Sequence, residues 1–246
     1  MTSELPALPE PPELPLPMMP PLRVTLVGMP GSGKSTVGRQ LARHLDLPFV
    51  DTDAEIEHQV GMPIREFFDT HGEAVFRDRE SEVIHALTQE TGALVMATGG
   101  GAVIRAENRE RLRATSHVFY LRSSPEELHR RLRHDTHRPL LQVADPLRRL
   151  RDLYRDRDPL YRQAAHFVVE TPRPSVSGLV HMVLMQLELA GWLDPSQVPS
   201  PVDRPPPSRA NPAEGESKNP RCASPTFVHT RTSGSAMATR ALISPA

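Results

Sequence analysis

Cysteine, lysine and long apolar runs are all scarce in this sequence. Its single cysteine, Cys222, excludes a disulfide bond within the chain. No uninterrupted apolar stretch approaches the roughly 20 residues that a membrane-spanning helix needs. The formal net charge is −1, so no excess of one sign favours nucleic acid or an acidic membrane surface as a partner. We therefore expect a cytoplasmic protein without nucleic-acid or membrane partners.

Proline is sparse in the middle of the chain and abundant near both ends. Eight of the 27 prolines lie in residues 1–21 and ten lie in residues 194–246. Segments of this composition bury too little apolar surface to form a core. We expect a Pro-rich, disordered N-terminal extension over residues 1–21, one folded domain over 22–193 and a disordered C-terminal tail over 194–246.

Lysine is almost absent, and one of the few lysines lies in a glycine-rich motif. Of the 29 basic residues only Lys34 and Lys218 are lysines. Lys34 belongs to the segment Gly28–Ser35, which matches the pattern G-x-x-x-x-G-K-[S/T]. An apolar, strand-like run precedes this segment and a helix-period pattern follows it, as a phosphate-binding loop requires. An ordinary glycine turn is the alternative, but this context predicts a site for a nucleoside triphosphate.

Strand-like apolar runs alternate with helical patterns through the middle of the chain. The expected strands cover residues 24–27, 48–50, 93–97, 118–121 and 166–169. Ser124, followed by proline and by Glu127, predicts the start of a helix. Such alternation is typical of a parallel sheet with helices on both faces. We expect the fold class α/β, as a three-layer α/β/α fold with a five-stranded parallel sheet.

Two carboxylates, Asp51 and Asp53, follow the second expected strand. A side-chain period of two places both on the same side of the carboxyl edge, where α/β sheets bind ligands. Asp51 then suits Mg²⁺ held through water, and Asp53 suits the orientation or deprotonation of an acceptor hydroxyl. An Asp N-cap followed by a solvated helix start is the alternative.

Arginines and glycines further along the chain are also candidates. Arg77 and Glu80, spaced i, i+3, form either part of a site or a surface ion pair. Gly99–Gly101 follow a buried strand, so they let a backbone with free N–H groups approach a ligand, or they form a flexible turn. Arg138, in an irregular stretch, suits a loop arginine that reaches phosphates. Arg157 precedes an expected proline-initiated helix and either binds a carboxylate bidentately or pairs with its flanking aspartates.

Taken together, these motifs resemble the shikimate kinase family. The matching segments are Gly28–Thr36, Asp51–Asp53, Phe76–Glu80, Gly99–Gly101, Arg138–Leu141 and Arg157–Tyr161, in the order and with the spacing of that family. The resemblance covers about residues 22–190. It implies a nucleoside-monophosphate-kinase-like P-loop fold with a mobile lid and a mobile substrate-binding segment. It also implies ATP-dependent phosphorylation of the 3-hydroxyl of shikimate, on the chorismate route to aromatic amino acids.

The resemblance further implies a role for each matching residue. The catalytic residues are Asp53 as the base, Lys34 and Arg138. The shikimate-binding residues are Asp53, Phe76, Arg77, Glu80, Gly99, Gly100, Gly101 and Arg157. The ATP-binding residues are Gly31, Ser32, Gly33, Lys34, Ser35, Thr36, Arg131 and Arg138. One Mg²⁺ ion accompanies the co-substrate ATP, bound by Ser35 directly and by Asp51 through water, and the enzyme is expected to be a monomer.

Two other functions are compatible with the residues. The first is a kinase of the same fold that acts on another small acceptor, such as gluconate or a nucleoside monophosphate. The second is a non-catalytic module that binds a nucleotide and recruits partners through its terminal segments.

Overall fold

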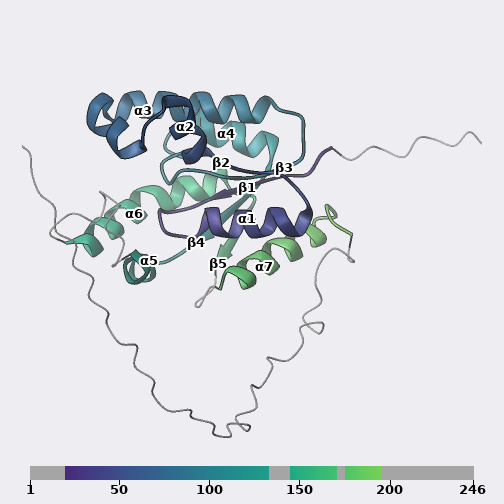
Figure 1. The fold of residues 1–246 in the computed structure, drawn as a ribbon. Coiled ribbons are helices and arrows are strands. Elements are labelled where there is room, and N and C mark those ends of the chain that lie inside the picture. The colour runs from purple at the N-terminus through teal and green to yellow at the C-terminus, as the bar shows by residue number, and fades with distance from the viewer. Residues whose placement is uncertain (1–19, 133–144, 171–174, 195–246) are drawn as a thin grey trace, which may run out of the picture. The chain divides into compact units, whose positions relative to one another are not determined.

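Strands and helices alternate along the chain in the computed structural model, which describes residues 20–132, 145–170 and 175–194 (Figure 1). The strands are β1 (Arg23–Val27), β2 (Phe49–Asp51), β3 (Leu94–Ala97), β4 (His117–Arg122) and β5 (Phe167–Glu170). The helices are α1 (Lys34–Leu45), α2 (Thr52–Val60), α3 (Ile64–Gln89), α4 (Ala106–Thr115), α5 (Pro125–Leu132), α6 (Pro146–Ala164) and α7 (Val176–Leu189). None of the helices in these ranges is long and apolar enough to cross a membrane.

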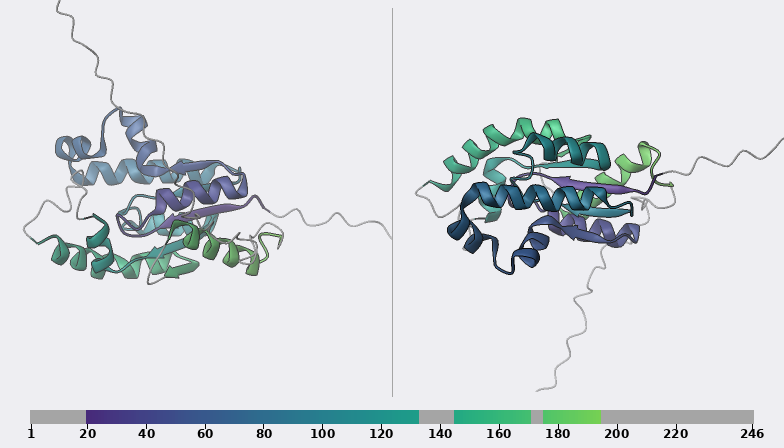
Figure 2. Two further views of the ribbon diagram at one scale, coloured as in Figure 1. Left: turned by 60° about the horizontal axis from the view of Figure 1, so that its bottom comes forward. Right: turned by 90° about the horizontal axis from the view of Figure 1, so that it is seen from above.

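The five strands form one parallel sheet in the order β2-β3-β1-β4-β5. Its two faces carry separate apolar clusters, because successive side chains of a strand point to opposite sides. On β1, Val24 and Leu26 join the cluster closed by α1 and α7, whereas Val27 joins the cluster that includes α3, α4 and α6. Figures 1 and 2 show α1 and α7 on one face of the sheet and α3 and α4 on the other. The expected three-layer α/β fold is confirmed.

Two local predictions about helix starts have different outcomes. Ser124 caps α5, since its Oγ accepts the N–H of Glu127 at 3.2 Å and the helix begins at Pro125 as expected.

The expectation that Pro159 begins a helix is wrong. Helix α6 starts at Pro146, where Asp145 accepts the N–H of Arg148 at 2.9 Å, and it runs on through Pro159. Pro159 is tolerated because it lies on the exposed face of the helix, where water can reach the carbonyl that its missing N–H leaves unpaired.

His166 joins the starts of β4 and β5 through both its backbone and its ring. Its N–H donates to the carbonyl of Val118 at 2.8 Å, and its ring Nδ1 accepts the N–H of Val118 at 3.1 Å. The His117 ring lies 6.2 Å away and packs in turn on Trp192 at 4.1 Å between ring centroids. Burial lowers the pKa of His166, and the nearby Arg113 and His117 lower it further. The neutral ring is therefore part of the native structure.

We expect the protein to lose stability as the pH falls below the pKa of a histidine in the unfolded chain, which is about 6.5. In that range the unfolded chain binds a proton that folded His166 resists, so the free energy of unfolding decreases with falling pH. Thermal midpoints measured between about pH 7.5 and 5.5 should fall less steeply in His166→Asn, whose amide oxygen can replace the Nδ1 acceptor without titrating. His44→Gln, at an exposed position, is the control. Equal slopes for His166→Asn and the unmodified protein would contradict the prediction.

Candidate active site

The loop between β1 and α1 has the backbone that the glycine motif predicts. Gly28, Gly31 and Gly33 have φ values of 150°, 83° and 94°, which residues with a side chain rarely adopt. The ammonium group of Lys34 donates to the carbonyls of Gly28 at 2.9 Å and Met29 at 3.1 Å. The buried lysine thus already lies against the loop at the carboxyl end of β1.

The first turn of α1 is open to an anion. Gly33, at the N-cap, supplies no side-chain acceptor for the N–H groups of that turn. The hydroxyl of Ser32 is buried and has no hydrogen-bond partner. Ser35 is half-buried and Thr36 is exposed at the start of the helix. Unpaired donors at a helix N-terminus are what phosphate oxygens bind.

Asp51 and Asp53 lie together at the carboxyl edge, although not for the expected reason. Strand β2 ends at Asp51 and α2 begins at Thr52, so a strand period does not relate the two side chains. Asp51 is the N-cap of α2, and its Oδ1 accepts the N–H of Asp53 at 3.1 Å. The N-cap alternative is therefore right for Asp51, while Asp53 is placed by the first turn of the helix.

Asp53 is not part of a solvated helix start. Its carboxylate packs against Gly99, where any β-carbon would overlap Oδ1. Burial raises the pKa of Asp53, and the positive charge of Lys34 opposes this rise. The carboxylate is therefore close enough to Lys34 for their charges to interact, which places it near the phosphate-binding loop.

The predicted Mg²⁺ donors are the Ser35 hydroxyl and the Asp51 carboxylate. Both are hard oxygen ligands near the carboxyl edge of the sheet, since Asp51 is the last residue of β2 and Ser35 lies in the first turn of α1, which follows β1. In the part of the chain that the structure describes, no three His, Cys, Asp or Glu side chains are arranged to hold a metal. This donor set fits Mg²⁺ that takes its remaining ligands from water and nucleotide phosphates.

Arg77 and Glu80 do not form a surface ion pair. Their side chains are 12% and 1% exposed, and Nη1 of Arg77 lies 2.6 Å from Oε2 of Glu80. Glu73 binds the same guanidinium group at 3.1 Å, and the ring of Phe76 lies 5.1 Å from its central carbon. Burial lowers the pKa of Arg77, but its bonds to Glu80 and Glu73 raise it by more. The guanidinium is thus held as a cation in one orientation, while Oε1 of Glu80 is buried without a partner.

Gly99–Gly101 bring several site residues together. A β-carbon at these positions would overlap Asp53 and Glu80 at Gly99, Pro30 at Gly100 and Arg77 at Gly101. None of the three has a positive φ, so glycine is needed here for close packing rather than for a flexible turn. The expectation that the backbone N–H groups are free for a ligand is wrong for Gly99, because its N–H donates to Oγ1 of Thr52 at 3.0 Å.

Arg157 reaches the same glycine segment from α6. Its Nη1 donates to the carbonyl of Gly100 at 3.1 Å. The flanking Asp158 instead accepts from Tyr120 at 2.9 Å and from Arg162 at 2.7 Å. Arg157 therefore points toward the edge where the phosphate-binding loop and Asp53 meet, and pairing with that aspartate is not its role.

Of the two arginines predicted to bind ATP, the structure describes only Arg131. Arg131 lies in the last turn of α5, where it pairs with Glu127 at 2.6 Å. The next residue, Leu132, packs against Gly31, where a β-carbon would lie 2.7 Å from its side chain. Leu132 thus contacts the phosphate-binding loop, the described contact of Arg131 is with Glu127, and Arg138 lies outside the described residues.

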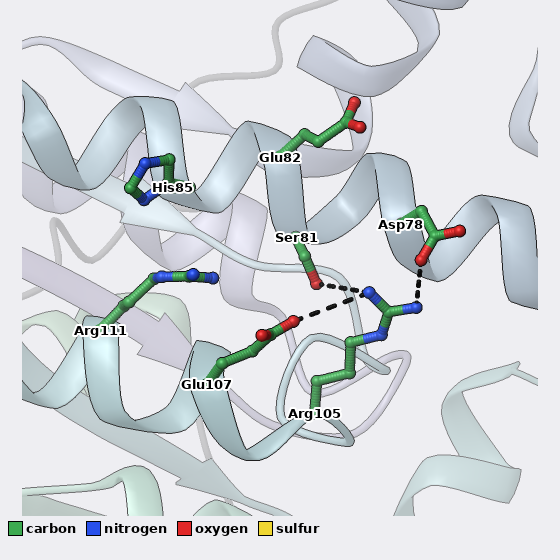
Figure 3. Close-up of a pocket in the computed structure, with 7 residues that line it drawn as sticks. All are labelled: Asp78, Ser81, Glu82, His85, Arg105, Glu107 and Arg111. Atoms are coloured by element: carbon green, nitrogen blue, oxygen red, sulfur yellow. Dashed lines mark hydrogen bonds and ion pairs between the residues drawn. The ribbon is translucent and has the colours of Figure 1, made fainter.

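A cavity between α3 and α4 is separate from these residues (Figure 3). Its volume is about 360 Å³, and it is lined by Asp78, Ser81, Glu82, His85, Arg105, Glu107 and Arg111. Arg105 crosses it to Asp78 at 2.5 Å and Ser81 at 3.3 Å, as Figure 3 shows. These contacts attach the segment that follows Gly99–Gly101 to α3. The side chains that line the cavity therefore help to hold the glycine segment in place, but the cavity is not part of the site.

Comparison with known proteins identifies the family. Residues 30–188 match the family model described as shikimate kinase. A curated shikimate kinase from Paracidovorax citrulli is 59% identical over 179 residues, which are 72% of this chain and 98% of that protein. The chain belongs to the shikimate kinase family. A shikimate kinase from Ralstonia nicotianae is 53% identical over 74% of this chain and 95% of its own length.

Solved structures agree with this membership. The structure titled shikimate kinase from Acinetobacter baumannii in complex with shikimate has 45% sequence identity and a TM-score of 0.66. The match covers 72% of this chain and 97% of that one. A shikimate kinase from Bacteroides thetaiotaomicron has 31% identity and a TM-score of 0.62 over 68% of this chain and 98% of its own.

Three residues that support the glycine segment of the shikimate kinase site lie within the matching motifs, but the motifs alone indicate no role for them. Pro30 packs on Gly100, Thr52 binds Gly99, and Tyr161 binds the carbonyl of Gly100. For Tyr161 a signal was available. It follows Arg157 by four residues, so recognition of one continuous helix would have placed both on the same face.

Proposed function

We propose that this protein transfers the γ-phosphoryl group of ATP to the 3-hydroxyl of shikimate, on the route to aromatic amino acids. The observation that carries the proposal is the convergence of the phosphate-binding loop, half-buried Asp53, Arg77 and Arg157 on one glycine segment. Shikimate carries a carboxylate and ring hydroxyls. Guanidinium forks bind a carboxylate, and a carboxylate side chain accepts from hydroxyls.

The phosphate side of the reaction depends on the β1–α1 loop. Backbone N–H groups and the ammonium of Lys34 bind the phosphates, and we assign Thr36 and Arg131 to ATP binding on the basis of the family resemblance. Mg²⁺, held by Ser35 and through water by Asp51, would offset charge on the β- and γ-phosphates. We assign Arg138 to the transferred phosphate on the basis of the motif that contains it.

The acceptor side depends on groups that are already held in place. Asp53 accepts the proton of the attacking hydroxyl, and its burial brings its pKa closer to neutrality, as suits a general base. Arg77, fixed by Glu80 and Glu73, and Arg157, fixed by Gly100, bind the acid and the ring hydroxyls. Phe76 supports the Arg77 guanidinium from below. Positioning and fixed charges supply most of the acceleration, since phosphoryl transfer needs little covalent work from the protein.

A panel of acceptors tests this proposal. ADP release by the purified protein is measured with ATP and, in turn, shikimate, gluconate or CMP, with a Lys34→Met sample to reveal contaminating enzymes. We expect release that depends on shikimate and on Lys34. Release with gluconate or CMP but not with shikimate would favour another acceptor. ATP binding without any acceptor-dependent release would favour the non-catalytic module.

A further inference from the structure

The carbonyl of Gly100 is shared by two side chains of α6. The phenol of Tyr161 donates to it at 2.6 Å, and Nη1 of Arg157 donates to it at 3.1 Å. A carbonyl oxygen has two lone pairs, so these two bonds complete its hydrogen bonding. On its other side, Gly100 packs so closely on Pro30 of the phosphate-binding loop that a β-carbon would not fit.

Tyr161 cannot easily leave this position. Its side chain is fully buried and its ring stacks on Tyr120 with centroids 4.9 Å apart and planes 25° apart. The Tyr120 phenol donates to Asp158, which also binds Arg162 and Arg122. Burial raises the pKa of the Tyr161 phenol well above its usual range, so the hydroxyl keeps its proton and remains a donor.

We propose that Tyr161 is a positioning residue for the acceptor. Its hydroxyl fixes the Gly100 carbonyl and, through that oxygen, the guanidinium group of Arg157 that binds the substrate carboxylate. The inference rests on the proposed function. Without the hydroxyl, Arg157 would be the only side chain on a carbonyl with an unpaired lone pair. The glycine segment and the guanidinium would then shift together away from the geometry that the carboxylate requires.

Tyr161→Phe tests the proposal because it removes one hydroxyl and keeps the stacked ring. We expect the KM for shikimate to rise by about 3- to 10-fold, the scale of one neutral hydrogen bond, with kcat and the KM for ATP changed by less than about twofold. Tyr120→Phe is the matched control, since it makes the same change in the adjacent ring but leaves Gly100 untouched. Its KM for shikimate should equal that of the unmodified protein, and thermal midpoints show that both variants are folded.

A double-mutant cycle with Arg157→Lys separates positioning from general support. If Tyr161 acts through Arg157, Tyr161→Phe will have little further effect on KM once the fork-shaped contact is gone. Additive losses, equal losses for shikimate and ATP, or an unchanged KM in Tyr161→Phe would each overturn the inference. Failure of the proposed function is seen separately, as absence of shikimate-dependent ADP release from the unmodified protein.

Discussion

Lys34→Met is expected to abolish shikimate-dependent ADP release, with kcat lowered by about 10³-fold or more, the scale of removing a cation from a transferred phosphoryl group. Methionine keeps the apolar stem of the buried side chain but cannot donate to the carbonyls of Gly28 and Met29 or neutralise phosphate charge. The coupled assay at saturating ATP and shikimate measures the loss. Circular dichroism checks that the variant is folded.

The chain offers its own control for this experiment. Lys218 is its one other lysine, it lies outside the described residues, and Lys218→Met makes the same change in charge. We expect that variant to keep full activity. Lys34→Arg should not restore turnover, because a planar fork cannot replace a compact ammonium inside the closely packed loop. Turnover above about a tenth of normal in Lys34→Met would contradict the assignment.

Asp53→Asn is expected to lower kcat by about 10²- to 10⁴-fold, the usual contribution of a positioned acid or base. The amide has nearly the same shape, so it fits against Gly99, but it cannot take the proton of the acceptor hydroxyl. Initial rates at saturating substrates measure kcat. Asp69→Asn, at an exposed position of α3, is the control and should leave kcat unchanged.

The pH profile gives the same assignment a second test. Burial raises the pKa of Asp53 even though Lys34 opposes it, and the base acts only when deprotonated. In the unmodified protein, kcat/KM should therefore fall as the pH drops through this raised pKa, above the value for a free carboxyl. The residual activity of Asp53→Asn should lack that acidic limb. Near-normal kcat, or an unchanged acidic limb, would remove Asp53 from the role of base.

Much of the fold could be predicted because its signals are local. Strands β1, β3 and β4 are mainly apolar runs that are buried on both faces, which is why the sequence predicts their bounds to within one residue. Ser124 caps α5 through an atom only three residues away. Pro159 was misjudged because proline at a helix start and proline on an exposed helix face look alike in sequence. The distinction lies in which side of α6 is covered.

The amino-acid sequence by itself determined the phosphate-binding loop, since three glycines at fixed spacing suffice to set its backbone. Only the tertiary structure decided that Glu80 is buried against a half-buried Arg77, that Gly100 packs on Pro30, and that Tyr161 shares a carbonyl with Arg157. The physical reason is the distance along the chain over which the interactions act. Backbone dihedrals and caps depend on neighbours within a few residues, whereas burial and the pairing of α6 with the glycine segment depend on where distant elements pack.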